Sequence, residues 1–222
     1  MSARILSTLI ASMLLAGGAA AEPERHHDPD PDRARLLQAL ADHAAGRLAR
    51  AERALRALAA RGVPAAAFNL GVMHLHGEVP RADPLMAKRL FEQAARAGFA
   101  TAQFALGRLH ESGRLGRRDL AQAHRWYEAA AERGSVEAQV EAGTAYYLGR
   151  GAPASPRLAA AWYLRAARGG DVGAMYLIAS MYEHGHGVAQ DLAAALYWYA
   201  QAAALGDRLA AAKAAQLGSA GL

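Results

Sequence analysis

The stretch DLAQAHRWYEAAAERG, residues 119–134, decides the fold because its pattern returns at a fixed interval of 36 residues. Each copy has a capping residue at its start, an aromatic or apolar pair among alanines, and a glycine at its end. The opening residues are Asp83, Asp119, Ser155 and Asp191, and the closing residues are Gly98, Gly134, Gly170 and Gly206. A repeat of this size without insertions is typical of a solenoid, in which each unit buries its apolar face only against its neighbours.

A second helical segment precedes this stretch in every unit. Small residues recur in it at two positions, and they are Ala66, Ala102, Ala138 and Ala174, then Gly71, Gly107, Gly143 and Ala179. Glycine costs about 1 kcal/mol relative to alanine in a helix, so its recurrence indicates close contact with a partner helix. These segments are predicted to end in left-handed glycine caps, at Gly77, Gly113, Gly149 and Gly185. The sequence therefore predicts an all-α fold of antiparallel helix pairs, each second helix being capped by an Asp or Ser side chain.

The period divides the chain into units with short additions at both ends. Four repeats are predicted at residues 63–98, 99–134, 135–170 and 171–206. Residues 33–62 keep the leucine spacing of helices and are predicted to form two degenerate capping helices, which Gly46 separates. Residues 207–222 repeat the first helix once more, so we expect a C-terminal capping helix and tail.

The first residues have the pattern of a signal peptide. Arg4 precedes an apolar run of residues 5–15, and Ala19-x-Ala21 offers a cleavage site after Ala21. The run is shorter than the ~20 residues that a membrane-spanning helix needs, although retention as an uncleaved anchor stays open as an alternative. Residues 22–32 are polar and proline-rich, which predicts a disordered lead-in containing a solvated His26-His27 pair.

Composition excludes several classes of function. The chain has no cysteine, so disulfides, thiolate catalysis and cysteine metal sites are unavailable. The formal net charge is +5, but basic and acidic residues alternate, which disfavours nucleic-acid binding. No nucleophile motif, paired acidic site or phosphate-binding glycine loop has the required spacing, so we predict neither catalytic residues nor a cofactor.

The repeats resemble the Sel1-like family, whose units are helical hairpins related to tetratricopeptide repeats. The resemblance rests on AAAFNLGVMHLHGE, TAQFALGRLHESGR, VEAQVEAGTAYYLGRG and VGAMYLIASMYEHGHGV, followed by AHRWYEAAAERG, AAWYLRAARGG and ALYWYAQAAALG. It implies a right-handed α-solenoid that holds proteins or peptides on its concave side, and exported bacterial members resemble adaptors and regulators of the envelope. A cysteine-rich subgroup is associated with β-lactams, but its paired cysteines do not occur in this chain.

Aromatic and histidine residues are better explained by packing than by ligand binding. Three Trp-Tyr pairs recur at a framework position and are predicted to fill the core, and they are Trp126-Tyr127, Trp162-Tyr163 and Trp198-Tyr199. His74 and His110 occupy the position that holds tyrosine in the later units. His76 and His184 lie three repeats apart, too far to share a zinc ion, so no metal site is predicted.

Candidate partner-binding residues are those on one helical stripe that the period does not conserve. At 100° per residue, Asn69, Val72 and His76 share a face, and the later units carry other side chains at the same positions. The equivalents are Ala105, Arg108 and Ser112, then Glu141, Thr144 and Leu148, then Leu177, Ser180 and His184. We predict that this variable stripe lines the concave groove and that Arg108, Glu141 and His184 select the partner.

Together these features predict a non-catalytic protein-binding scaffold or regulator in the bacterial cell envelope, periplasmic or secreted. Its partner would be a protein or peptide, with no nucleic acid, no membrane insertion after signal cleavage and a monomeric state. One alternative is a Sel1-repeat protein that binds or hydrolyses cell-wall or β-lactam compounds. Another is a structural component of a secretion or polysaccharide-export assembly.

Overall fold

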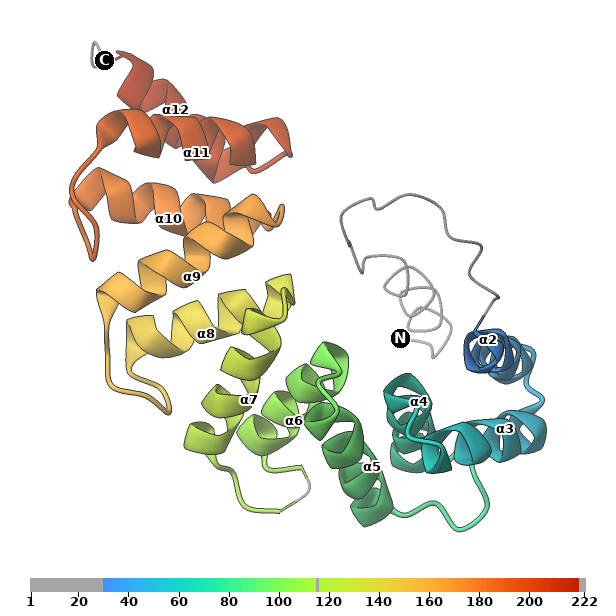
Figure 1. Cartoon of the computed structure of the whole chain (residues 1–222). Coiled ribbons are helices and arrows are strands. Elements are labelled where there is room, and N and C mark those ends of the chain that lie inside the picture. The colour runs from blue at the N-terminus through green and yellow to red at the C-terminus, as the bar shows by residue number, and fades with distance from the viewer. Residues whose placement is uncertain (1–29, 115, 220–222) are drawn as a thin grey trace.

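A computed structural model describes residues 30–114 and 116–219, and within them the chain forms helices joined by short loops and contains no strand (Figure 1). The helices are α2 (Pro31–Ala44), α3 (Leu48–Ala60), α4 (Pro64–His76), α5 (Pro84–Arg96), α6 (Ala100–Ser112), α7 (Leu120–Glu132), α8 (Val136–Leu148), α9 (Pro156–Arg168), α10 (Val172–His184), α11 (Leu192–Ala204) and α12 (Arg208–Ser219). The predicted all-α architecture is confirmed. The expected signal peptide, its cleavage site and His26-His27 lie outside the described residues.

The N-terminal helix pair begins two residues earlier than predicted. Asp30 caps α2 by accepting a hydrogen bond from the backbone N–H of Asp32 at 3.0 Å, and Pro31 occupies the first turn, where it needs no hydrogen bond. Residues 30–32, which we expected in the lead-in, therefore form the cap and the first turn of α2. Gly46 separates α2 from α3 with φ 74°, as the sequence predicted.

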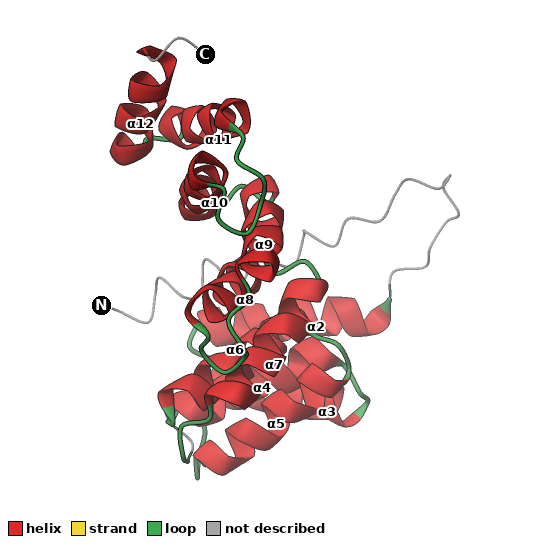
Figure 2. Cartoon of the chain, turned by 90° about the vertical axis from the view of Figure 1, so that its left-hand side faces the viewer, coloured by secondary structure: helices red, strands yellow, loops and turns green. Residues whose placement is uncertain are grey.

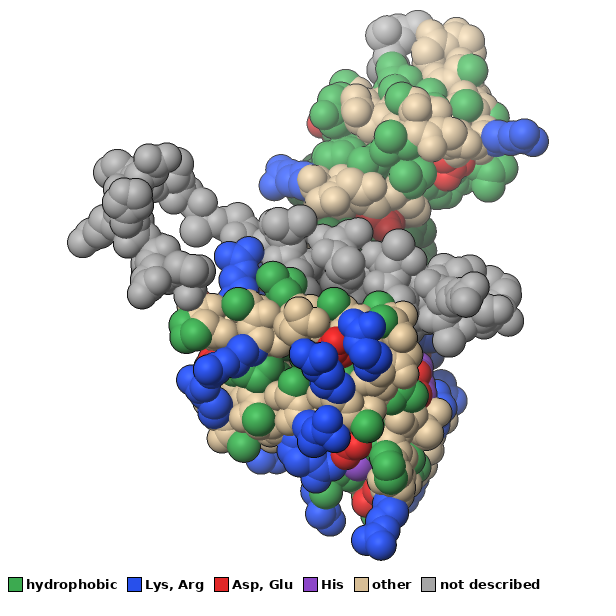
Figure 3. All heavy atoms as spheres, turned by 90° about the vertical axis from the view of Figure 1, so that its right-hand side faces the viewer, with side chains coloured by type: hydrophobic (Ala, Val, Ile, Leu, Met, Phe, Trp, Pro, Cys, Tyr) green, Lys and Arg blue, Asp and Glu red, His purple; other side chains and the backbone are tan. Residues whose placement is uncertain are grey.

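A buried carboxylate fixes the turn between α2 and α3. Asp42 lies inside the pair and accepts hydrogen bonds from Gln38 at 3.2 Å and from the Arg47 Nε at 3.0 Å. Arg50 adds an ion pair at 3.0 Å. Burial acts to raise the pKa of Asp42, but these hydrogen bonds and the two arginine charges outweigh it and hold the pKa below its ordinary value. Figure 3 shows that Lys and Arg side chains gather over this end of the molecule.

Helix ends are set by the residues that the repeat conserves. The first helices of the four units end at glycines with left-handed backbone, namely Gly77, Gly113, Gly149 and Gly185. The second helices begin at side-chain caps, namely Asp83, Asp119, Ser155 and Asp191, each of which accepts from a backbone N–H of the first turn. Both features match the predicted caps. They explain why the loop of each unit connects its two helices at equivalent positions.

Small residues and tyrosines pack against each other inside each unit. A Cβ atom added to Gly107 would lie 2.5 Å from the ring of Tyr127, and one added to Gly143 would lie 2.8 Å from that of Tyr163. Both tyrosines are buried, as are Tyr199 and Trp162, whereas Trp126 and Trp198 are half-buried. The aromatic pairs thus belong to the core, as the sequence predicted, with the tyrosines more deeply buried than two of the tryptophans.

The helices follow a curved path from α2 to α12 (Figure 1). In the N-terminal half, α4 and α6 lie on the inner side of the curve and α5 lies on the outer side. Figure 2 shows α10, α11 and α12 extending away from the helices of the first units. None of the helices in the described part of the chain is long and apolar enough to span a membrane. Each helix packs mainly against the helices that precede and follow it in the chain, so first and second helices alternate along the stack.

Candidate partner-binding surface

The variable stripe contains exposed and half-buried side chains. Six of its residues are exposed, namely His76, Arg108, Ser112, Leu148, Leu177 and His184. The others, Asn69, Val72, Ala105, Glu141, Thr144 and Ser180, are half-buried. Val72 packs against the N-terminal hydrophobic core, so its side chain contributes to packing as well as to the surface.

Several stripe residues are held by their own helix. The side-chain amide of Asn69 donates to the carbonyl of Ala65 at 2.7 Å, and the Ser112 hydroxyl donates to that of Leu109 at 3.3 Å. His184 Nδ1 lies 2.8 Å from the carbonyl oxygen of Ser180, which orients the ring along the helix. These bonds hold the three side chains in defined orientations along their own helices.

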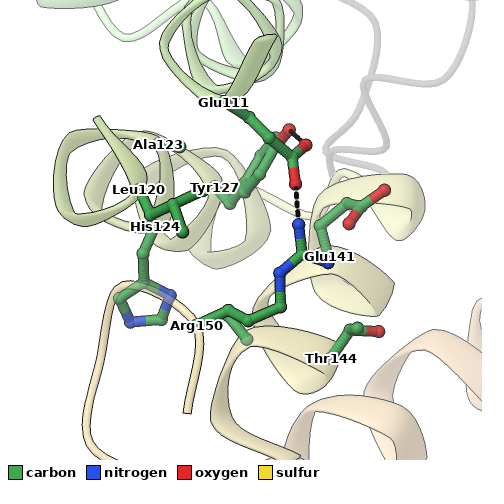
Figure 4. A pocket seen from close by; sticks show the side chains of 9 residues that line it. Glu111, Leu120, Ala123, His124, Tyr127, Glu141, Thr144 and Arg150 are labelled. Carbon is green, nitrogen blue, oxygen red and sulfur yellow. Dashed lines mark hydrogen bonds and ion pairs between the residues drawn. The ribbon is translucent and has the colours of Figure 1, made fainter. Parts of the chain in front are cut away.

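The central part of the surface is a hydrogen-bonded cluster between α6, α7 and α8 (Figure 4). Glu111 accepts from the Tyr127 hydroxyl at 2.8 Å with one oxygen and pairs with Arg150 at 2.6 Å through the other. Burial, followed by the hydrogen bond to Glu111 and that residue's charge, raises the pKa of Tyr127 far above its ordinary value. The tyrosine is therefore a fixed donor that holds the Glu111 carboxylate in place.

Glu141 lies beside this ion pair but is not part of it. Its carboxylate turns away from the Glu111–Arg150 pair in Figure 4, and it has no hydrogen-bond or ion-pair partner among the residues described. Burial and the charge of Glu111 raise its pKa, and the charges of Arg108 and Arg150 only partly offset them. Glu141 is thus a half-buried carboxylate whose charge is only partly compensated by the positive charges near it.

A small cavity of about 20 Å3 separates these groups. Glu111, Tyr127, Glu141, Thr144 and Arg150 contribute to its lining. This volume fits one water molecule and no larger ligand, so the cavity is not a substrate pocket. Thr144 donates to the carbonyl of Val140 at 2.9 Å, which leaves its oxygen to accept from the Tyr163 hydroxyl at 3.1 Å.

The C-terminal unit contains a matching cluster. Glu183 accepts from the Tyr199 hydroxyl at 2.7 Å and pairs with Lys213 at 2.8 Å. Burial acts to raise the pKa of Glu183, but the hydrogen bonds from Lys213 and Tyr199 hold it below its ordinary value. Glu111 and Glu183 occupy the same position of the repeat, as do Tyr127 and Tyr199, so both clusters use one geometry.

An apolar patch lies between these two clusters. It consists of Tyr147, Leu148 and Leu177, which are 46%, 56% and 38% exposed. Tyr147 packs against His186 with ring centroids 5.4 Å apart. Tyr147 and Leu177 occupy the positions equivalent to Glu111 and Glu141 one unit further along the chain, and Leu148 is equivalent to Ser112, so this surface changes from acidic to apolar within one repeat.

The histidines of the predicted first helices have separate structural roles. His74 is buried, and its Nδ1 accepts from the backbone N–H of Asp83 at 3.3 Å, so it joins α4 to the cap of α5. His110 is half-buried. In the part of the chain that the structure describes, no three His, Asp or Glu side chains are grouped so that they could hold a metal ion.

Sequence reasoning did not identify Glu111, Arg150, Glu183 or Lys213 as parts of the surface. Our stripe included three positions per helix and omitted the one that holds Glu111 and Glu183. The signal was present in the sequence, because that position alternates between Leu75, Glu111, Tyr147 and Glu183 as strongly as any position in the stripe. Lys213 extends the series of Glu141 and Leu177 into the final helix, which we treated only as a cap.

The fold and this surface define an α-solenoid whose repeated helix pairs present a variable face. A family model for the Sel1 repeat matches residues 64–99, 100–135, 136–171 and 172–207, and the chain belongs to the Sel1 repeat family. These bounds begin one residue after those that we predicted. Sel1 repeat proteins are in general non-catalytic scaffolds for protein interactions. Among curated proteins, none matches the chain significantly.

Two solved bacterial structures support the same fold. One is c5321 of uropathogenic Escherichia coli, described as a protective antigen, with a TM-score of 0.73 and 30% identity over 81% of this chain and 39% of that one. The other is a Sel1 repeat protein from Oxalobacter formigenes, with a TM-score of 0.74 and 29% identity over 86% of this chain and 57% of that one. The chain therefore spans about two-fifths and just over half of the lengths of these relatives.

Proposed function

We propose that this protein is a non-catalytic scaffold of the bacterial cell envelope that holds a protein or peptide partner on the variable stripe. The observation that carries the proposal is the contrast between the two parts of each unit. Caps, glycines and tyrosines repeat and build the stack, whereas the residues along α6, α8 and α10 change from acidic to apolar and remain accessible. Variation on a rigid repeated frame is how solenoids present an extended binding surface.

The shape of the molecule supports this use of the stripe. First and second helices alternate along a curved path, with α4 and α6 on its inner side (Figure 1). A partner segment lying along that side would contact several units at once. Its total contact area would then depend on the number of repeats and not on any single deep pocket, and the central cavity is indeed only about 20 Å3.

The proposed site can be tested by site-specific photo-crosslinking in the native bacterium. A photoreactive amino acid at Leu148 or Ser112, both exposed on the stripe, is expected to capture a defined envelope protein that mass spectrometry identifies. The same amino acid at Arg125 or Ala193, which are exposed on second helices, serves as the control and should capture little. Equal capture from both sets of positions, or none from the stripe, would reject this surface as the binding site.

Export is supported by the sequence of residues 1–21 and has its own test. We expect the mature protein to be recovered from the periplasmic or secreted fraction with Glu22 as its first residue, because Ala19-x-Ala21 fits a signal-peptidase site. N-terminal mass spectrometry of the fractionated protein measures this directly. A full-length N-terminus in the membrane fraction would instead favour the uncleaved anchor.

A further inference from the structure

We propose that Glu141 and the apolar patch of Tyr147, Leu148 and Leu177 form a two-part subsite for a partner segment that carries a lysine or arginine near an aliphatic or aromatic residue. The inference rests on the proposed function, because it names the chemistry that the variable stripe would select. It gives the stripe a charge preference that neither the family nor the repeat pattern supplies.

Two units of the chain place different charges at one position of the repeat. Lys213 occupies the position of Glu141 two repeats later, and Glu183 and Tyr199 occupy those of Glu111 and Tyr127. In the C-terminal unit the Lys213 ammonium lies 2.8 Å from Glu183, which also accepts from Tyr199. This geometry shows that a cation placed over the tyrosine-bound carboxylate is well accommodated between two successive first helices.

The central unit departs from this arrangement in one respect. It has Glu141 where the C-terminal unit has a lysine, so two carboxylates from α6 and α8 approach the same place. Arg150, from the loop after α8, supplies the positive charge that Glu111 needs, through an ion pair of 2.6 Å. No second cation within ion-pair distance serves Glu141 among the described residues, and its carboxylate points away from the pair (Figure 4).

Partial burial makes this carboxylate selective. A half-buried carboxylate has already lost part of its hydration, so a cation brought against it gains more than at a fully exposed site. Burial and the nearby Glu111 also make the position unfavourable for an acidic group. Arg108 is exposed and beyond ion-pair distance, so it can turn into solvent when a partner's cation approaches. Charge complementarity therefore favours a basic side chain.

The apolar patch supplies the second half of the subsite. Tyr147 and Leu148 follow Glu141 on α8 by six and seven residues, Leu177 lies on α10, and beyond the patch Glu183 is already neutralised by Lys213. Residues six or seven positions apart on an α-helix lie about 9–10 Å apart along its axis, and an extended chain advances about 3.3 Å per residue. A partner segment would therefore place its basic and apolar side chains about two to four positions apart.

Selection from a displayed library of random dodecapeptides tests this preference with the mature full-length protein. We expect the retained peptides to be enriched in Lys or Arg two to four positions from an aliphatic or aromatic residue. A synthetic peptide of that sequence should bind Glu141→Lys at least tenfold more weakly than wild type in fluorescence anisotropy. Glu132→Lys, the same change at an exposed site on α7, is the matched control and should differ less than twofold from wild type.

A thermal melt completes the test. Glu141→Lys places a lysine at the position that Lys213 occupies in the C-terminal unit, so the variant should stay folded, with a melting temperature close to that of wild type, while losing the peptide. If that variant misfolds, Glu141→Gln keeps the side-chain size, and its expected loss is threefold or more. Retained peptides without basic residues, or equal binding by Glu141→Lys and Glu132→Lys, would overturn this inference and leave the crosslinking result intact. The absence of stripe crosslinks in the native bacterium would instead overturn the proposed function.

Discussion

At the scale of single residues, glycine in the first helices makes room for an aromatic ring from the second. Gly107 is the tightest example, because a Cβ atom there would lie 2.5 Å from Tyr127. That distance is shorter than carbon atoms tolerate, so either the ring or the helix would have to move. The ring is also tied to Glu111 by its hydroxyl, which limits how far it can shift.

We expect Gly107→Ala to destabilise the protein by about 1–3 kcal/mol, the usual cost of overpacking a core. Chemical denaturation followed by circular dichroism measures the change. Gly218→Ala is the matched control, since Gly218 lies in α12 with nothing within 4 Å of the added Cβ, and it should be neutral or slightly stabilising. Similar losses for both variants would show that the ring contact is not the cause.

The hydroxyl of Tyr127 provides a second test at this scale. Tyr127→Phe removes the donor that holds Glu111, and we expect a loss of about 1–2 kcal/mol because a hydrogen bond to a partly buried charge is broken. Tyr197→Phe is the control, because Tyr197 is 56% exposed. The comparison uses urea unfolding of both variants, and equal stability would argue against the cluster as a structural anchor.

At the scale of helices, the boundaries are set by capping residues that can be recognised in the sequence. Asp119 caps the N-terminus of α7 by accepting a hydrogen bond from the backbone N–H of Gln122 at 2.9 Å. Gly113 ends α6 in the left-handed conformation. Each cap acts on backbone groups within a few residues of itself, so the repeat period alone was enough to predict it. The extra turn residues Pro31 and Asp32 of α2 were missed because proline was counted as a lead-in signal and not as a first-turn residue.

Removing one cap should have a local and modest effect. We expect Asp119→Ala to cost about 1 kcal/mol, because the first turn of α7 loses its side-chain acceptor. Asp119→Asn retains an acceptor oxygen and should stay within a few tenths of a kcal/mol of wild type. Thermal unfolding of the pair measures the difference, and an equal loss in both would point to the charge of Asp119 in place of its hydrogen bond.

At the scale of the whole molecule, buried tyrosines in successive units link stability to alkaline pH. Burial, the hydrogen bond to Glu128 and that residue's charge raise the pKa of Tyr146 to about 12. A group with a raised folded-state pKa contributes full stability below its ordinary value of 10.0 and loses it as the pH rises towards the folded value. Burial raises the pKa of Tyr127, Tyr163 and Tyr199 as well, so several units respond in the same direction.

We therefore expect the melting temperature to fall as the pH increases from 10 to 12, within the window that the Tyr146 shift defines. Tyr146→Phe should lose some stability at neutral pH and show a smaller decline in the alkaline range. Differential scanning calorimetry across this range measures both. A constant melting temperature up to pH 12 would contradict the raised pKa values.

The stack was predictable from the sequence, whereas the central cluster was not. Glycine, tyrosine and the caps act at fixed offsets inside one unit, so their roles follow from the period. The Glu111–Arg150 pair joins residues 39 positions apart, and Arg150 comes from a loop position that the helical stripe does not contain. Similarly, Val72 was assigned to the surface although it also packs into the core, because a helical wheel cannot show how far a neighbouring unit covers it.

The connections between successive units, such as Gly134-Ser135, affect how the number of repeats can change. Gly134 has a positive φ and nothing within 4 Å of where a Cβ would be, and Ser135 immediately caps the next helix. A duplicated unit inserted between them would bring its own cap and its own glycine, and would meet neighbours of the kind it already packs against. Gene duplication could therefore lengthen the binding surface one unit at a time without redesigning either end.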